Sequence, residues 1–251
     1  MRRVGALVVL GFFWVSLSAA DLGMAGQRPQ NANDPVNDLN FAEKLKIVVP
    51  EFDSAGLPMA EIVVHLAYKY KLPTAIEYAD RNSLRKPLQL KLRNRTVHQI
   101  ILAVVSSIPA YSVDFAEGLV DVYSSDGRRD KSNPLNVEIP RYDANALDTR
   151  FADAELFCDL TRQLQPHSGC GGSVAGGQWG NRKITLFLKG MKVYEILNAI
   201  VAQNGQALWV PAPQQEHTTS ITRDFWYIYP LDAPFETSAV EQLQSLVRSA
   251  T

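Results

Sequence analysis

Four histidines and two cysteines are the side chains of this 251-residue sequence best suited to catalysis or metal binding. The histidines are His65, His98, His167 and His217. No two of them lie three or four residues apart, the spacing with which one helix presents two zinc ligands. His65 and His98 fall on the polar faces of expected helices, which indicates a solvated surface. The sequence therefore predicts no metal site, no cofactor and no catalytic residue among these side chains.

A glycine-rich stretch over 169–180 is the most unusual segment. It lacks the lysine of a phosphate-binding loop and the G-x-S-x-G arrangement of a serine nucleophile. Two G-x-x-G pieces in it resemble the loop with which KH domains clamp nucleic acid, but here they would join a helix to a strand. The formal net charge is −1, so no positive field gathers phosphates and nucleic-acid binding is not expected. Two interpretations stay open, a long connecting loop and a partner-binding loop anchored by Trp179.

The N-terminus has the composition of an export signal. Two arginines at positions 2 and 3 precede an uncharged apolar run over 4–17, and small residues follow up to Ala20. This run is shorter than the roughly 20 residues of a membrane-spanning helix, so we expect cleavage near Ala20. The mature chain would carry a net charge of −3, and no later segment is long and apolar enough to span a bilayer. We expect a periplasmic or secreted protein without a transmembrane segment after signal removal.

The two cysteines, Cys158 and Cys170, lie 12 residues apart. An oxidising compartment permits a disulfide between them, and the loop that it closes has a feasible length. Sequence spacing does not supply the Cβ geometry that a disulfide requires. A bonded pair and two unrelated cysteines therefore both stay open.

Two stretches at an offset of 96 residues share one pattern. The first has aliphatic residues at the alternate positions 88, 90 and 92, followed by a helical pattern over 96–107. The second has aliphatic residues at 184, 186 and 188, followed by a helical pattern over 192–203. Eight apolar positions match without a gap, which indicates an internal duplication. Thr96 and Gln99 form a capping box at the first helix, whereas Lys192 replaces the threonine in the second.

Further elements complete each half. Apolar spacing predicts a helix over 59–70 and a second-half helix ending near 164, with Asp153 as its N-cap. Period-two alternation predicts strands at 46–52, 74–78, 111–115, 119–124, 207–210 and 225–229. We predict an α+β fold of two tandem modules, each roughly βαββαββ with two helices packed on one face of a short mixed sheet.

The expected boundaries follow from composition. They are a signal peptide over 1–20, a flexible lead-in over 21–43, module 1 over 44–126, a linker over 127–134, module 2 over 135–232, and a C-terminal tail or short helix over 233–251. Small cores are marginal when isolated, so we expect the modules to pack on each other or on a partner.

The strand–turn–helix stretches resemble the short N-terminal modules of secretins and TonB-dependent transducers. Residues 88–97 read LQLKLRNRTV and residues 184–193 read ITLFLKGMKV, like the strand, polar turn and helix start of that family. The resemblance covers most of 44–232. The family's glycine–aromatic step after the second helix is missing, and no pore or barrel domain follows, so the resemblance leads us to expect an adaptor.

The resemblance implies a protein–protein interaction module of the bacterial envelope, not an enzyme, that acts in secretion, outer-membrane transport or signalling. Its partner would belong to a secretin-, TonB- or anti-sigma-type system, and a homo-oligomer is a further option. Docking would use a sheet edge or face. The alternative is an exported hydrolase or small-ligand-binding protein with a site between the modules. Convergence of His167, Cys158 or Asp159 in a pocket would favour that alternative.

Two further groups of residues are candidates for partner binding. The strand over 225–229 is apolar on both faces, so one face needs a cover from the C-terminal helix, the first module or another chain. A basic cluster before the second helix of module 1 is either a solvated face or a surface for an acidic partner or lipid headgroups. Besides Trp179, the candidates are Phe225, Trp226, Tyr227, Tyr229, Arg85, Lys86, Arg93 and Arg95.

Overall fold

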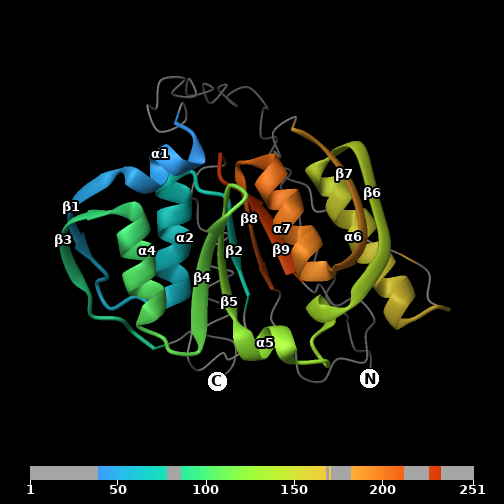
Figure 1. Ribbon diagram of the computed structural model, residues 1–251, viewed down its shortest axis with the longest axis horizontal. Helices are drawn as coiled ribbons and strands as arrows, with labels where there is room; N and C mark the ends of the chain where they lie inside the picture. Colours follow the sequence, from blue (N-terminus) through green and yellow to red (C-terminus); the bar gives the residue numbers. More distant parts are fainter. Residues whose placement is uncertain (1–38, 78–85, 168–169, 171–181, 212–225, 233–251) are drawn as a thin grey trace, which may run out of the picture. The chain divides into compact units, whose positions relative to one another are not determined.

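A five-stranded mixed sheet lies at the centre of the fold and takes strands from both halves of the chain. The computed structural model describes residues 39–77, 86–167, 170, 182–211 and 226–232, which belong to one unit over 35–251 (Figure 1). The sheet order is β4-β5-β2-β8-β9, in which β2 pairs in parallel with β5 and β8 and each outer pair is antiparallel. Its strands are Thr74–Ile76 (β2), Tyr111–Ala116 (β4), Leu119–Ser124 (β5), Ala207–Pro211 (β8) and Trp226–Pro230 (β9).

Each face of this sheet is covered by one pair of helices. Alternate side chains point to opposite faces of a strand, so Leu208 and Val210 enter the core beside α2 and α4 while Trp209 enters the core beside α6 and α7. The helix pairs therefore lie on opposite faces of one shared sheet. The helices are Met59–Tyr70 (α2), Val97–Ser106 (α4), Thr149–Leu164 (α6) and Val193–Asn204 (α7).

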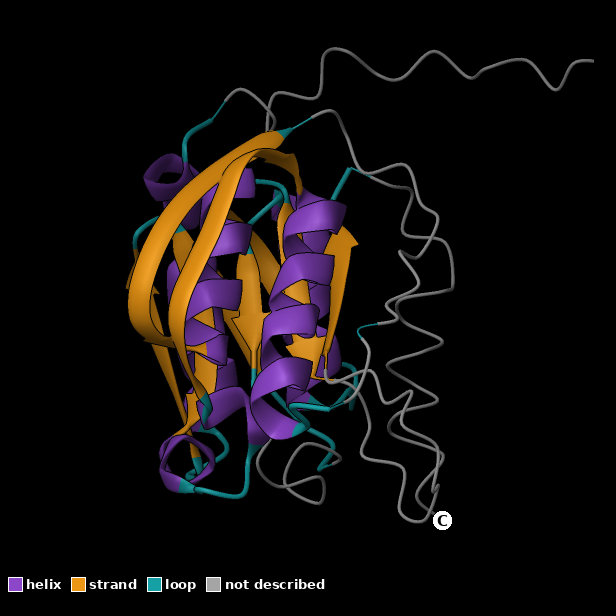
Figure 2. Ribbon diagram, turned by 90° about the vertical axis from the view of Figure 1, so that its right-hand side faces the viewer, coloured by secondary structure: helices purple, strands orange, loops and turns teal. Residues whose placement is uncertain are grey.

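A two-stranded antiparallel ribbon lies on the outer side of each helix pair (Figures 1 and 2). The layers run ribbon, helix pair, sheet, helix pair, ribbon, and Figure 2 shows the β6–β7 ribbon crossing in front of its two helices. The ribbon strands are Val48–Asp53 (β1), Lys91–Thr96 (β3), Glu138–Asp148 (β6) and Lys183–Lys192 (β7). The predicted α+β class is confirmed, although the two halves share one central sheet and each helix pair also contacts a ribbon.

The two halves correspond in local detail. Asn94 and Gly190 are 96 residues apart and both have a positive φ, 51° and 59°, shortly before α4 and α7. The first N–H of each helix, at Val97 and Val193, donates at 3.0 Å to a backbone carbonyl just before the partner ribbon strand. These correspondences support the internal duplication, which stays a prediction.

Helix starts differ in two places from the sequence prediction. Asp148, not Asp153, is the N-cap of α6, and its carboxylate accepts a hydrogen bond from the N–H of Arg150 at 3.1 Å. The capping box of Thr96 is present. The start of α7 keeps one of the two hydrogen bonds of a capping box, in which the Glu195 carboxylate accepts the backbone N–H of Lys192 at 2.7 Å.

Short helices occupy segments that we expected to be irregular. Phe41–Lys46 (α1) begins inside the expected lead-in, with Asn40 and Glu43 as a capping box. Ser125–Arg129 (α5) and a 3-10 turn over Pro134–Asn136 lie at the expected linker and connect the halves. In the part of the chain that the structure describes, no helix has both the length and the hydrophobicity to span a bilayer.

Candidate functional site

A cluster of charged side chains lies where the two halves meet. Arg128 of α5 donates hydrogen bonds to both carboxylate oxygens of Glu77, at 2.6 to 3.2 Å. Its Nη2 also donates to Oδ2 of Asp121 at 2.6 Å. The Arg128 guanidinium lies 3.6 Å from the ring centroid of Tyr123. Glu77 directly follows β2, and Asp121 and Tyr123 belong to β5, so this part of the cluster comes from the first half.

The second half completes the cluster from α7 and β8. Tyr194 places its ring centroid 4.5 Å from the guanidinium of Arg128. Asn198 donates to Oδ2 of Asp121 at 3.1 Å and accepts the indole N–H of Trp209 at 2.7 Å. The cluster therefore ties the central sheet to a helix of the second half through side chains from both.

Burial perturbs the carboxylates of this junction. It raises the pKa of Glu77 to about 7, against the opposing effect of the hydrogen bonds and charge of Arg128. It also raises the pKa of Asp121, whose Oδ1 is buried and accepts no hydrogen bond within the described ranges. The three charged side chains are 7–20% exposed and bind one another. These contacts join the two halves through charged side chains that bind one another.

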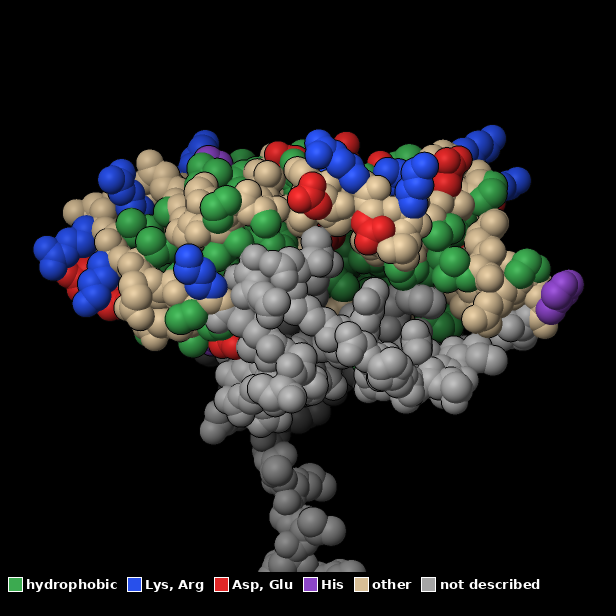
Figure 3. Space-filling view, turned by 90° about the horizontal axis from the view of Figure 1, so that it is seen from below, with side chains coloured by type: hydrophobic (Ala, Val, Ile, Leu, Met, Phe, Trp, Pro, Cys, Tyr) green, Lys and Arg blue, Asp and Glu red, His purple; other side chains and the backbone are tan. Residues whose placement is uncertain are grey.

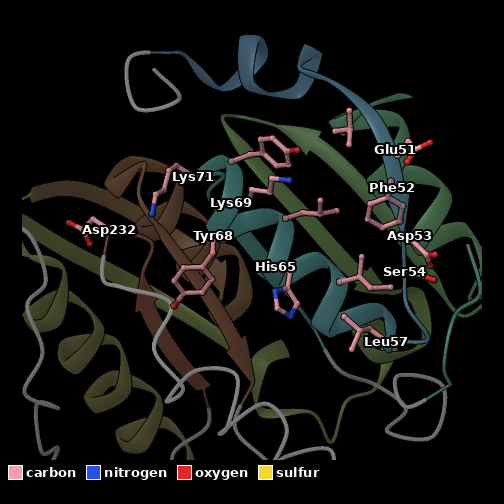
Figure 4. Close-up of a pocket in the computed structure, with 14 residues that line it drawn as sticks. Glu51, Phe52, Asp53, Ser54, Leu57, His65, Tyr68, Lys69, Lys71 and Asp232 are labelled. Carbon is pink, nitrogen blue, oxygen red and sulfur yellow. The ribbon is translucent and has the colours of Figure 1, made fainter. Parts of the chain in front are cut away.

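A cavity of about 640 Å³ lies between β1 and α2 in the first half (Figure 4). Phe52 of β1 and His65 and Tyr68 of α2 line it, and Figure 4 shows Lys71 and Asp232 at its far end. Burial lowers the pKa of His65 and raises the pKa of Tyr68 to about 12, with the Asp232 charge adding to the latter. The remaining lining combines aliphatic side chains with Tyr70 and the polar side chains of Glu51, Asp53, Ser54 and Lys69, so the cavity has both apolar and charged walls.

Exposed apolar side chains lie on the ribbons and on α6. Phe187 of β7 is 65% exposed and stands opposite Asp143, Val48 of β1 is 57% exposed, and Phe151 and Leu164 of α6 are 51% and 44% exposed. On the first ribbon, acidic β1 residues pair with basic β3 residues, at 3.6 Å for Glu51 and Arg93. Figure 3 shows acidic and basic side chains side by side at that end of the molecule. Among the described residues, no ribbon strand pairs with a third strand.

The aromatic strand predicted as a binding surface is used inside the protein. Trp226 is 5% exposed, joins the second core and donates from its indole N–H to Asp153 Oδ1 at 2.5 Å. Tyr227 and Tyr229 pack against the first core. Both faces of the described strand therefore pack against the chain's own cores, which is one of the covers that the sequence left open, and Tyr227 and Tyr229 stay partly exposed. Phe225 lies outside the described residues.

The predicted basic cluster is partly described and exposed. Lys86, Arg93 and Arg95 are exposed, and the latter two lie on β3. Arg93 is paired with Glu51, so the ribbon is not a uniformly basic surface. Arg85 and the loop residue Trp179 lie outside the residues that the structure describes.

The structure joins Cys158 to Cys170 in a disulfide, with their Cα atoms 5.3 Å apart. Asp159 pairs with Arg162 at 2.8 Å, and His167 is exposed. Cys158 is therefore not a free thiol, and these three residues do not form the inter-module site that the alternative function requires. Within the described ranges, no three His, Cys, Asp or Glu side chains converge as ligands for a metal ion.

Arg128 is the residue that sequence reasoning missed. It lies in the stretch over 127–134 that we predicted as a linker, where charged residues are common. One arginine among several charged residues of a polar stretch gives no sign of burial, because its partners Glu77 and Asp121 come from distant segments of the chain. Comparisons with protein-family models, curated proteins and solved structures give no match. The geometry above is therefore the basis for assigning a function.

Proposed function

We propose that this chain is an exported protein–protein interaction module of the bacterial envelope that docks its partner through the outer β-ribbons. The observation that carries the proposal is Phe187, 65% exposed on a ribbon that has no third strand in the described chain. Aromatic anchors and unpaired strand edges are the features with which sheets recruit other proteins. The resemblance to secretin and TonB-transducer modules fits this role and points to a partner from those systems, or to a second copy.

The β6–β7 ribbon has a suitable shape for docking. Its inward side chains, among them Ile139, Tyr142 and Ile184, are buried on α6 and α7 and hold it rigidly. The Tyr142 hydroxyl donates to the Ala152 carbonyl of α6 at 2.8 Å. A rigid surface loses little conformational entropy on binding. Phe187 is therefore presented from a fixed position.

An inter-module active site has less support. The space between the halves is filled by the shared sheet and by the Arg128 cluster, whose charged groups bind one another. The cavity described above lies within the first half instead. We therefore favour the interaction module over an exported hydrolase or ligand-binding protein.

Site-specific photocrosslinking in the envelope tests the proposal. A photoreactive residue at position 187 should attach to one partner protein or to a second copy. The same residue at Leu164, an exposed apolar position of α6 (44%), should attach far less. Phe187→Ser should then weaken the purified complex by about tenfold or more, the effect of losing an aromatic hot spot, while Leu164→Ser leaves it unchanged. Equal labelling from both positions, or no effect of Phe187→Ser, contradicts the proposal.

A further inference from the structure

Helix α2 needs a cover that its own ribbon does not supply. Ten of its twelve residues are buried, and its apolar residues cover every side of the helix except a polar stripe formed by Glu61, His65 and Lys69. A helix with so wide an apolar surface must be packed on more than one side. The central sheet and α4 cover two sides, but β1 and β3 pack mainly on α4. In the second half, the longer β6 packs along α6, the helix that corresponds to α2.

The cavity lies where that missing cover would be. It is bounded by β1 on one side and by α2 on the other (Figure 4). Leu57, Ile62 and Leu66 contribute aliphatic walls, with Phe52 of β1 opposite them. Its volume of about 640 Å³ is enough for several side chains of a packed helix or strand.

The chain itself arrives at this cavity near its C-terminal end. Leu231 is fully buried, its N–H donates to the Gln206 carbonyl at 2.8 Å, and Lys71 of the α2 C-cap donates to its carbonyl. The next residue, Asp232, lines the cavity. Nineteen residues follow it in the sequence.

Those nineteen residues have the composition that a cover for α2 requires. Val240, Leu243, Leu246 and Val247 recur at helical spacing and would form one apolar face. As a helix, the segment would be up to about 28 Å long, more than the roughly 18 Å of α2. The lead-in before α1 is a poorer candidate, because residues 21–38 contain few large apolar side chains.

We propose that residues 233–251 bind in the cavity between β1 and α2, with their apolar face toward α2. This segment would cover the outer side of α2, as β6 covers α6 in the second half. It would also cover the outer edge of β1, so a partner strand adding there would have to displace it. That last consequence rests on the proposed function, whereas the intramolecular docking does not.

Hydrogen exchange on the mature chain, residues 21–251, tests the docking. The variant Leu243→Asp/Leu246→Asp puts two charges on the apolar face of the segment. The control Ser245→Asp/Ser249→Asp puts the same charges on the other side. We expect amides of α2 to exchange at least tenfold faster in the first variant and within twofold of the parent chain in the control. Unchanged exchange in the first variant, or equal acceleration in both, overturns the proposal.

A crosslinking measurement covers the case in which the first variant fails to fold. A photoreactive residue placed at Leu243 in the otherwise unchanged chain should attach within residues 49–71, as mapped by mass spectrometry. Attachment elsewhere, or none, counts against docking. Neither measurement involves a partner protein, so failure of the docking proposal is distinguishable from failure of the proposed function.

Discussion

Arg128 and Glu77 form a bidentate ion pair with side chains only 20% and 7% exposed. The pair sits between the central sheet and α7, because the Tyr194 ring lies over the same guanidinium. Both charges are satisfied as long as both partners are present. Removal of one would leave the other charge buried, which is the costly state for a buried pair.

Arg128→Ala should lower the free energy of unfolding by roughly 3–5 kcal/mol, the range for breaking a buried ion pair. Glu77 and Asp121 would then be left close together without a cation. Urea denaturation followed by circular dichroism measures the change. Arg129→Ala is the matched control, since the exposed Arg129 only approaches the exposed Asp126 at 3.8 Å. The control should change stability by less than about 0.5 kcal/mol. Similar losses for both arginines would show that the cluster does not hold the halves together.

The Glu77 carboxyl should make stability depend on pH. Its pKa is raised from 4.5 to about 7 in the folded protein, so the folded state binds this proton more tightly than the unfolded state. The resulting stabilisation is complete below pH 4.5 and is lost as pH rises through 7, by roughly 3 kcal/mol. Glu77→Gln keeps a neutral side chain and should lack this component. The quantity to measure is the stability difference between the two proteins from pH 4.5 to 7.5. A difference that is constant, or that favours the parent chain more as pH rises, contradicts the raised pKa.

The disulfide between Cys158 and Cys170 should stabilise the fold by restricting the unfolded chain. The bonded cysteines are 12 residues apart, and the entropy that such a loop removes from the unfolded chain corresponds to about 3 kcal/mol in the free energy of unfolding. Cys158→Ser/Cys170→Ser should therefore unfold at a lower urea concentration than the oxidised parent chain. Reductant should bring the parent close to the variant and leave the variant unchanged. If reductant leaves the parent protein unaffected, the bond contributes no stability.

The left-handed residue before α7 should tolerate asparagine but not a β-branched residue. Gly190 has a φ of 59°, and a Cβ there would come 3.2 Å from Oε1 of Glu138. Gly190→Val should cost about 2 kcal/mol, because valine is strongly disfavoured at positive φ. Gly190→Asn should cost less than half of that, since asparagine occupies the corresponding position 94 with φ 51°. Equal losses in thermal denaturation would argue that the two positions are not equivalent.

Local structure followed from the sequence because it depends on near neighbours. Helix α2 was predicted over its observed range. The strands predicted over 111–115 and 119–124 are β4 and β5, which meet at Glu117 and Gly118, both with positive φ. The capping box of Thr96 and Gln99 was likewise visible as a pair three residues apart. The matching patterns at an offset of 96 residues indicated the similar halves.

Only the tertiary structure decided how the halves meet. Period-two alternation shows that a strand such as Trp226–Pro230 has two apolar faces, but it does not say what covers each. The parallel pairing of β2 with β8 joins residues more than a hundred positions apart, and that pairing gives Trp226 and Tyr227 their separate cores.

Dependence on residues far apart in the sequence also explains why the burial of Arg128 was not predicted. Its burial results from Glu77, Asp121 and Tyr194, which no local pattern connects to it. The sequence alone determined the elements and their resemblance to each other. The contacts between elements from different halves depend on long-range packing. Through these contacts Arg128, in the predicted linker, binds residues of both halves.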